Sequence, residues 1–299
     1  MLDSEKGGVA SRARDAVKAV GPDQLKPAVF GLLRDLIAEK TGVHFDEPKR
    51  PLLADKLAAE IQELGLTSFL DYYYLLRYDD PTGAHWSRVA DRLAVPETYF
   101  WRQPEQFEAL AKVVAPALLD GDRSRGLRIW SAACCTGEEP ISIAIALAEA
   151  GLLDSHAITI VGSDASPAML ERAKGNRYGP RSFRQLPEAL QRKYFVSDGS
   201  SHWRPISNIA SRVSWQLANL VKPEETQHLD TSDVIFCRNV FIYFSDESMQ
   251  RVAQRFARRM PPHGHLFLGA SESLTRLAVD LELREVAGTF VYVPARRNS

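Results

Sequence analysis

The sequence predicts an α/β fold with a doubly wound parallel sheet, preceded by a small helical bundle. From about residue 27 to residue 95 the apolar residues recur with a helical period. From about residue 105 short apolar runs alternate with amphipathic segments, which is typical of a parallel sheet with right-handed helical crossovers. The chain has 299 residues, a length that fits two domains.

Four helices are predicted in the first half, each with one apolar face that is expected to build the core of the bundle. Ser68 is placed to cap the third of them at its N-terminus. Residues that break helices separate the four segments: Thr41-Gly42, Pro48 and Pro51, Gly65, and Pro81-Thr82-Gly83. The apolar faces comprise Val29, Leu32, Leu33, Leu36 and Ile37; Leu53, Leu57, Ile61 and Leu64; Phe69, Tyr72, Tyr73 and Leu76; and Trp86, Val89 and Leu93.

The second half is predicted to contain buried strands, most of them followed by a helix. A polar, turn-rich stretch over about 180–218 interrupts this alternation, and a small antiparallel insertion that includes a strand at 213–217 fits it best. The buried strands are expected at 127–132, 158–162, 234–237 and 265–270. The predicted organisation is a flexible N-terminus (1–24), a helical domain (25–95), an α/β domain (96–294) with the insertion, and a flexible tail (295–299).

The composition excludes several classes of protein. Lys plus Arg number 37 and Asp plus Glu number 38, so the chain has no overall electrostatic attraction to nucleic acid or to an anionic membrane. No apolar run approaches the roughly 18 residues of a membrane span, and the first ten residues do not form a secretory signal. Three cysteines, two of them adjacent, do not make a disulfide framework, which favours the cytoplasm. The seven histidines lack metal-ligand spacing, so no metal site is expected.

The loop after the first predicted strand has the chemistry of a ligand site. Small residues at 132–135 and Gly137 let a ligand approach the main chain closely. The loop lacks the Gly-x-Gly-x-x-Gly pattern, and Glu138 and Glu139 stand where a phosphate-binding loop has Lys-Ser/Thr. A carboxylate there repels a pyrophosphate but suits an ammonium or sulfonium group; the alternative is a cap on the helix dipole.

Asp164 follows the second predicted strand and is placed to accept hydrogen bonds from ribose hydroxyls. The alternative is that Asp164, or Ser166 beside it, caps the next helix. A nucleoside that carries a positive charge and no phosphate would suit the carboxylates that follow both strands. S-adenosylmethionine is such a ligand.

Five segments of the chain form a recognisable set: Thr98–Arg102, Trp130–Pro140, Ser163-Asp164, Cys237–Phe244 and Gly269–Ser273. Together they resemble the CheR family of chemotaxis receptor glutamate methyltransferases. The resemblance runs from about residue 28 to residue 293. It implies an N-terminal helical domain, a class I S-adenosylmethionine-dependent methyltransferase domain with a small β-subdomain, and formation of methyl esters on receptor glutamates.

The resemblance also implies roles for individual residues: Tyr243 matches the active-site tyrosine of the family and Arg102 a cofactor-side arginine. We expect both Arg102 and Tyr243 to be catalytic. Arg102 either orients the substrate carboxylate or, alternatively, forms an interdomain ion pair; Tyr243 either faces the methyl path or is a core tyrosine. Pro96 departs from the family, which often has Asn there. The implied cofactor contacts are Thr98, Arg102, Ala133, Glu138 beside the methionine amino group, Asp164 at the ribose, Asn219 and Leu220 at the adenine, and Arg238 and Asn239.

The implied partner is the cytoplasmic helical domain of a methyl-accepting receptor, with the membrane reached only through that receptor. The cluster Lys49, Arg50 and Lys56 is either a docking patch for an acidic receptor helix or a solvated basic face. The segment between Phe195 and Asn219 is short, so no binding of a tethered receptor peptide is expected. Two rival functions are a non-catalytic S-adenosylmethionine- or nucleotide-binding regulatory domain and a Rossmann-type oxidoreductase.

Overall fold

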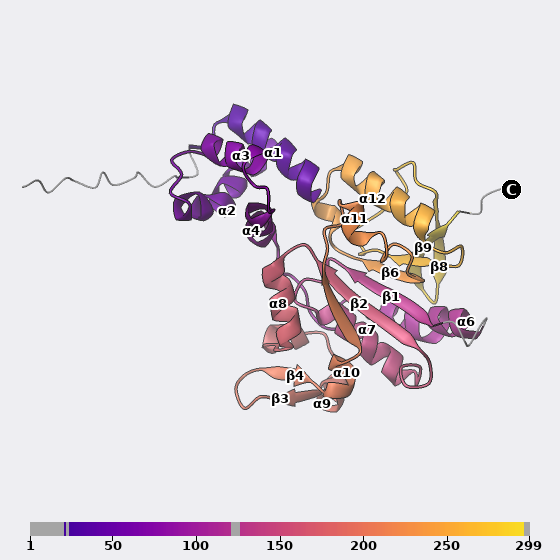
Figure 1. Cartoon of the computed structure of the whole chain (residues 1–299). Helices are drawn as coiled ribbons and strands as arrows, with labels where there is room; N and C mark the ends of the chain where they lie inside the picture. Colours follow the sequence, from indigo (N-terminus) through magenta and orange to yellow (C-terminus); the bar gives the residue numbers. More distant parts are fainter. Residues whose placement is uncertain (1–20, 22–23, 121–125, 296–299) are drawn as a thin grey trace, which may run out of the picture.

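The computed structural model describes residue 21, residues 24–120 and residues 126–295. Most of the segments expected to be flexible ends, 1–24 and 295–299, lie outside these residues. The described chain forms a helical bundle and an α/β domain (Figure 1). The bundle consists of α1 (Pro27–Thr41), a 3-10 turn η2 (Glu47–Lys49), α2 (Arg50–Glu63), α3 (Phe69–Tyr78) and α4 (Ala84–Leu93).

The helices of the bundle begin and end as their sequences predict. Pro27 occupies the first turn of α1, and Gly42 ends that helix in the left-handed conformation, with φ 79°. The Ser68 hydroxyl accepts the main-chain N–H of Asp71 at 3.1 Å, so the predicted cap of α3 is confirmed. The expected apolar face of α1 is wrong at Leu32, which is 44% exposed. Leu32 lies about 100° around the helix from Leu33, which is fully buried.

The α/β domain contains a seven-stranded sheet with the order β5-β2-β1-β6-β7-β9-β8. The first five strands in this order are parallel, and β9 and β8 form an antiparallel hairpin at one edge. Strand order reverses between β1 and β6, which makes their carboxyl ends the expected ligand site. The predicted fold class is therefore confirmed. The strands are β1 (Leu127–Ala132), β2 (Ile158–Asp164), β5 (Val213–Leu217), β6 (Val234–Cys237), β7 (His265–Phe267), β8 (Leu281–Val286) and β9 (Thr289–Pro294).

The assignment of 213–217 to an antiparallel insertion is wrong. This segment is β5, which pairs in parallel with β2 along Ile160–Asp164. The Trp215 ring covers two glycines: a Cβ on Gly162 would lie 2.8 Å from it, and one on Gly137 would lie 2.6 Å away. The small antiparallel sheet contains only β3 (Phe195–Ser197) and β4 (Trp203–Pro205), and it lies at the end of the molecule away from the bundle (Figure 1).

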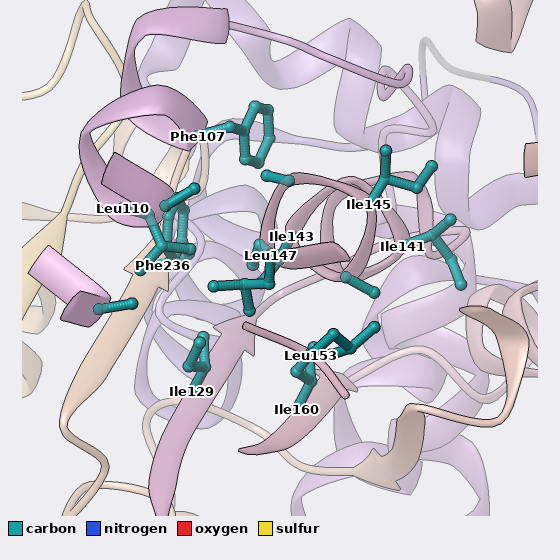
Figure 2. Close-up of a cluster of buried hydrophobic side chains, with 14 of the residues drawn as sticks. Phe107, Leu110, Ile129, Ile141, Ile143, Ile145, Leu147, Leu153, Ile160 and Phe236 are labelled. Carbon is teal, nitrogen blue, oxygen red and sulfur yellow. The ribbon is translucent and has the colours of Figure 1, made fainter. Parts of the chain in front are cut away.

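The core of the α/β domain fixes the helix that follows the ligand loop. Helix α7 (Glu138–Glu149) is buried over most of its length, and its apolar side chains pack beside Ile129, Ile160 and Phe236 of the sheet (Figure 2). Each such side chain contributes about 1.5–3 kcal/mol when fully buried. The start of α7, and with it the loop from β1, is therefore held rigidly at the carboxyl edge of the sheet.

The remaining elements connect these layers or cover the sheet. No helix among the described residues has both the length and the apolarity needed to cross a bilayer. The connecting elements are α5 (Pro104–Ala109), a π-helical segment η3 (Leu110–Val114), α6 (Ala115–Asp120), α8 (Pro167–Gly175), η4 (Pro180–Phe183), α9 (Glu188–Tyr194), α10 (Ser207–Ala210), α11 (Pro223–Thr226), η5 (Phe241–Tyr243) and α12 (Asp246–Arg259).

Candidate active site

Two adjoining cavities lie at the carboxyl ends of β1, β2 and β6. The outer cavity, of about 320 Å³, is lined by residues of both the helical bundle and the α/β domain. The inner cavity, of about 60 Å³, lies between the segment 95–102 and the ends of β1 and β6. Ala133, Cys135 and Asn239 line both cavities, so the two form one continuous site at the point where strand order reverses.

The loop after β1 brings its main chain to this site. Ala133, Cys135 and Gly137 all have positive φ angles, of 56°, 52° and 93°. Left-handed backbone at a non-glycine residue costs about 1–3 kcal/mol, and hydrogen bonds hold it here: the N–H of Cys134 donates to the Ser163 carbonyl and that of Cys135 to the Asp164 carboxylate, both at 2.8 Å. Ala133 therefore presents a small side chain to both cavities.

Asp164 ends β2 and lines the outer cavity. Its two carboxylate oxygens accept the N–H groups of Cys135, at 2.8 Å, and Ser166, at 2.9 Å. Burial raises the pKa of Asp164, and these backbone hydrogen bonds oppose the rise. The cap of α8 is Ser166, whose hydroxyl accepts the N–H of Met169, so Asp164 keeps lone pairs for hydroxyl groups of a ligand.

The two glutamates at the start of α7 face different ways. The carboxylate of Glu138 is buried and accepts the hydroxyls of Thr136, at 2.6 Å, and Ser182, at 2.8 Å. Glu138 lines neither cavity. Glu139 lines the inner cavity and accepts the Ser131 hydroxyl at 2.6 Å. The structure thus places Glu139 on the wall of the inner cavity and Glu138 behind it, among hydroxyl groups.

Arg238 follows β6 and lines the inner cavity. Its guanidinium lies 3.3 Å from the Glu139 carboxylate and donates to the Gln103 side chain at 3.0 Å and to the Arg102 carbonyl. Its carbon Cζ lies 5.3 Å from the centre of the Phe107 ring. Burial raises the pKa of Glu139, and the charge of Arg238 opposes that rise. The Arg238 charge therefore favours the ionised form of the Glu139 carboxyl at the wall of the cavity.

Thr98 and Arg102 line the inner cavity from the segment that joins the two domains. The Arg102 guanidinium donates to the Glu97 carbonyl at 2.8 Å and lies 5.4 Å from the centre of the Tyr99 ring. The structure gives Arg102 no ion pair among the described residues, so the interdomain ion pair is not observed. Its remaining N–H groups are available to a carboxylate.

Asn239 and Tyr243 belong to the short turn after β6. Asn239 has a left-handed backbone, with φ 59°. Tyr243 is 37% exposed and lines the outer cavity, so it is not a core residue. Three N–H groups of this turn donate to the carboxylate of Glu272, for which the sequence analysis expected no role. The only signal for Glu272 is its place in the segment Gly269–Ser273.

Asn219 and Leu220 complete the outer cavity at the end of β5. The Asn219 amide donates to the Lys40 carbonyl of α1 at 2.8 Å. Two further main-chain bonds join the domains: His44 N–H to the Tyr243 carbonyl at 2.8 Å, and Ser245 N–H to the Gly42 carbonyl at 3.2 Å. The bundle is thus a wall of the cavity, which its sequence did not indicate.

Lys49 and Lys56 also line the outer cavity, whereas Arg50 does not. Lys56 donates to the Arg92 carbonyl at 3.1 Å, and burial lowers the pKa of its ammonium group. The predicted basic cluster is therefore divided between the cavity and the outer surface. Among the described residues no group of three or more His, Cys, Asp and Glu side chains could hold a metal ion.

A parallel sheet with reversed strand order, an acid at the end of its second strand and an acid at the start of its first helix define a class I, S-adenosylmethionine-dependent methyltransferase. Two family descriptions match the chain: "CheR methyltransferase, all-alpha domain" over residues 28–94 and "CheR methyltransferase, SAM binding domain" over residues 96–288. The chain belongs to the CheR methyltransferase family.

Curated relatives cover most of the chain. Chemotaxis protein methyltransferase 2 of Vibrio cholerae is 35% identical over 250 residues, which make up 83% of this chain and 86% of the relative. Chemotaxis protein methyltransferase 1 of Pseudomonas aeruginosa is 32% identical over 89% of this chain and 97% of the relative. The Escherichia coli chemotaxis protein methyltransferase is 33% identical over 87% of this chain and 89% of the relative.

Proposed function

We propose that this chain transfers the methyl group of S-adenosylmethionine to glutamate side chains of chemotaxis receptors, giving methyl esters and S-adenosylhomocysteine. The observation that carries the proposal is the continuous site formed by the two cavities, in a chain of the CheR family. The outer cavity is lined by Asp164, Asn219 and Leu220, which suit a nucleoside. The inner cavity is bounded by Glu139 and Arg102.

The residues present fit S-adenosylmethionine. The left-handed loop of small residues gives a ligand close access to the main chain, and the acids on the two cavities match a ribose and an ammonium group. Asp164 would accept the ribose hydroxyls, Asn219 and Leu220 would flank the adenine, and Glu139 would hold the methionine ammonium. Thr98, Ala133 and Asn239 would line the path between these groups.

The chemistry requires alignment and no general base. Glutamate has a reference pKa of about 4.3 and is therefore ionised at neutral pH. S-adenosylmethionine supplies a methyl group on a positively charged sulfur: a C–O bond forms, the C–S bond breaks, and its electron pair stays on sulfur without any proton transfer. Arg102 would hold the substrate carboxylate in line, and Tyr243 would wall the methyl path. Such alignment is worth on the order of 7–11 kcal/mol.

The substrate we propose is the cytoplasmic helical segment of a receptor, which places the enzyme in the cytoplasm and brings it to the membrane only through that receptor. Lys49 is exposed and Arg50 half-buried at the start of α2, each within 3.4 Å of a nearby carboxylate. The carboxylates of an acidic receptor helix would replace Asp46 and Glu47 as the ion-pair partners of Lys49 and Arg50. The loop between β3 and β4 is short, which supports the proposal that no tethered receptor peptide is bound.

Labelled methyl transfer tests the proposal. The chain is incubated with tritiated S-adenosylmethionine and receptor-containing membranes, and label that is released by mild base is counted. We expect base-labile label that the Asp164→Ala variant produces only at a higher cofactor concentration. If no ester forms at saturating cofactor while calorimetry still detects S-adenosylhomocysteine, the chain is a cofactor-binding regulatory domain, a function that its family membership does not favour.

A further inference from the structure

Glu272 lies in the turn after β7 and lines neither cavity. Its carboxylate accepts four main-chain N–H groups. Oε2 accepts those of Asn239 and Gly269, and Oε1 accepts that of Phe241, each at 2.7 Å; Oε1 also accepts that of Ile242 at 3.3 Å. Hydrogen bonds to an ionised acceptor are roughly twice as strong as neutral ones, so this carboxylate binds the turn firmly.

The turn that Glu272 binds carries four residues of the site. Asn239 lines both cavities, and Val240, Ile242 and Tyr243 line the outer one. The turn has little regular structure of its own: Asn239 is left-handed, and η5 spans only three residues. Three of the four N–H groups on the Glu272 carboxylate belong to this turn. The carboxylate therefore supplies the partners that a helix or sheet would otherwise provide.

Gly269 leaves the space that this arrangement needs. A Cβ on Gly269 would lie 2.5 Å from Nδ2 of Asn239 and 2.8 Å from Oε2 of Glu272. Any side chain at 269 would thus displace both the carboxylate and the Asn239 amide. This constraint is independent of the hydrogen bonds, and it points to the same contact.

We propose that Glu272 is the positioning residue of the methyl-transfer site: through four main-chain N–H groups it fixes the turn 239–243, so that Asn239 and Tyr243 take their places on the cavity walls. The inference rests on the proposed function for its kinetic readout. Glu272 is assigned a role through the backbone of this turn, because it reaches neither cavity.

Glu272→Gln tests the proposal, because the amide keeps the size but offers N–H groups to two of the donors. We expect kcat to fall about 100-fold, the effect of a misplacement of about 1 Å, while the Kd for S-adenosylhomocysteine stays within about fivefold, since Asp164 and Glu139 remain. Amide hydrogen exchange should accelerate at residues 239, 241 and 242 and stay unchanged in β1 and β2. Glu285→Gln, on the exposed edge strand β8, is the matched control.

Gly269→Ala is the second variant, because it displaces the same carboxylate from another residue. We again expect kcat to fall while the Kd for S-adenosylhomocysteine changes little. The kcat of the double variant should be only slightly lower than that of either single variant. The proposal is overturned if both variants keep kcat within twofold, or if kcat falls only in proportion to lost cofactor binding or lost folded protein. The exchange and calorimetric readouts need no receptor, so a failure of the proposed function stays distinguishable.

Discussion

At the scale of single residues, the site contains buried acids whose carboxyl groups are held by specific partners. Asp164 is held by backbone N–H groups and Glu139 by Arg238 and the Ser131 hydroxyl. Burial raises the pKa of both carboxyls. A cation that enters the inner cavity therefore meets a carboxylate that burial has made easier to protonate, and this makes binding of the ligand sensitive to pH.

The affinity for S-adenosylhomocysteine should fall as the pH is lowered through the pKa of Glu139. Its ammonium group binds the ionised carboxylate, and in the free protein that carboxyl takes up a proton at a higher pH than an ordinary glutamate. Titration calorimetry from pH 8 to pH 5 measures the dependence. Glu139→Gln should bind more weakly at pH 8 and lose this dependence, whereas Glu138→Gln should keep it. Equal profiles for both variants would contradict the assignment.

Arg102 and Asp164 should separate turnover from cofactor affinity. Arg102→Ala is expected to lower kcat about 100-fold with little change in Kd, because the residue would align the acceptor. Asp164→Ala is expected to raise the Kd about 10- to 100-fold, the loss of hydrogen bonds to a charged group. Methyl-transfer kinetics and calorimetry on both variants measure these effects. A large rise of Kd in Arg102→Ala would assign that residue to the cofactor instead.

At the scale of elements, helix α4 reaches across to the α/β domain beside the site. Asp91 accepts the Ser166 hydroxyl and, at 3.0 Å, the N–H of Ala168. It therefore adds a carboxylate cap to α8 beside the hydroxyl cap of Ser166. This contact, the Asn219 bond to α1 and the main-chain bonds around Gly42 all join the bundle to the α/β domain. The bundle holds the cavity wall through them.

Removal of this cap should weaken both the fold and the cofactor site. Asp91→Ala is expected to lower the free energy of unfolding by about 1 kcal/mol, the usual contribution of a helix cap, and to raise the Kd for S-adenosylhomocysteine several-fold, because α8 begins next to Asp164. Urea unfolding and calorimetry measure the two effects. Asp55→Ala, an exposed aspartate of α2, serves as the control. An unchanged Kd would show that α4 supports α8 without shaping the cavity.

The helices and strands were largely predictable from the sequence, because the helical period of the apolar residues differs clearly from the short continuous apolar runs of the buried strands. Strand β5 was not, since a five-residue strand fits a parallel edge as well as an insertion, and its partner is decided by the packing of Trp215 on Gly162. The site was partly predictable: Ala133, Arg102 and Asp164 lie on the cavities. Glu138 and Glu139 are neighbours, so only the orientation in which α7 begins tells which of them faces the site.

At the scale of the whole molecule, the outer cavity joins the two domains into one ligand site. Its lining runs from Thr41 and Lys49 in the bundle to Asp164 and Tyr243 in the α/β domain. A ligand that fills it contacts both domains. Binding energy is therefore added to the stability of the whole chain and not of one half.

S-adenosylhomocysteine should stabilise both domains together. At 100 times its Kd, a ligand of the folded state adds about 2.7 kcal/mol. Scanning calorimetry should show a single transition that moves to higher temperature, and amide exchange should slow in α1 and α2 as well as in β1 and β2. Asp164→Ala at the same ligand concentration should show a much smaller shift. Slower exchange confined to the α/β domain would contradict a shared site.

The position of Lys49, Leu52 and Lys56 on the outer cavity has a consequence for the order of turnover. A receptor helix lying along α2 would cover the route by which the nucleoside leaves. The spent cofactor would then stay trapped until the methylated receptor dissociates, so one docking event allows one ester. The rate of S-adenosylhomocysteine release, measured by stopped flow, should fall as a receptor fragment is added. If the rate does not depend on the fragment, the receptor binds elsewhere.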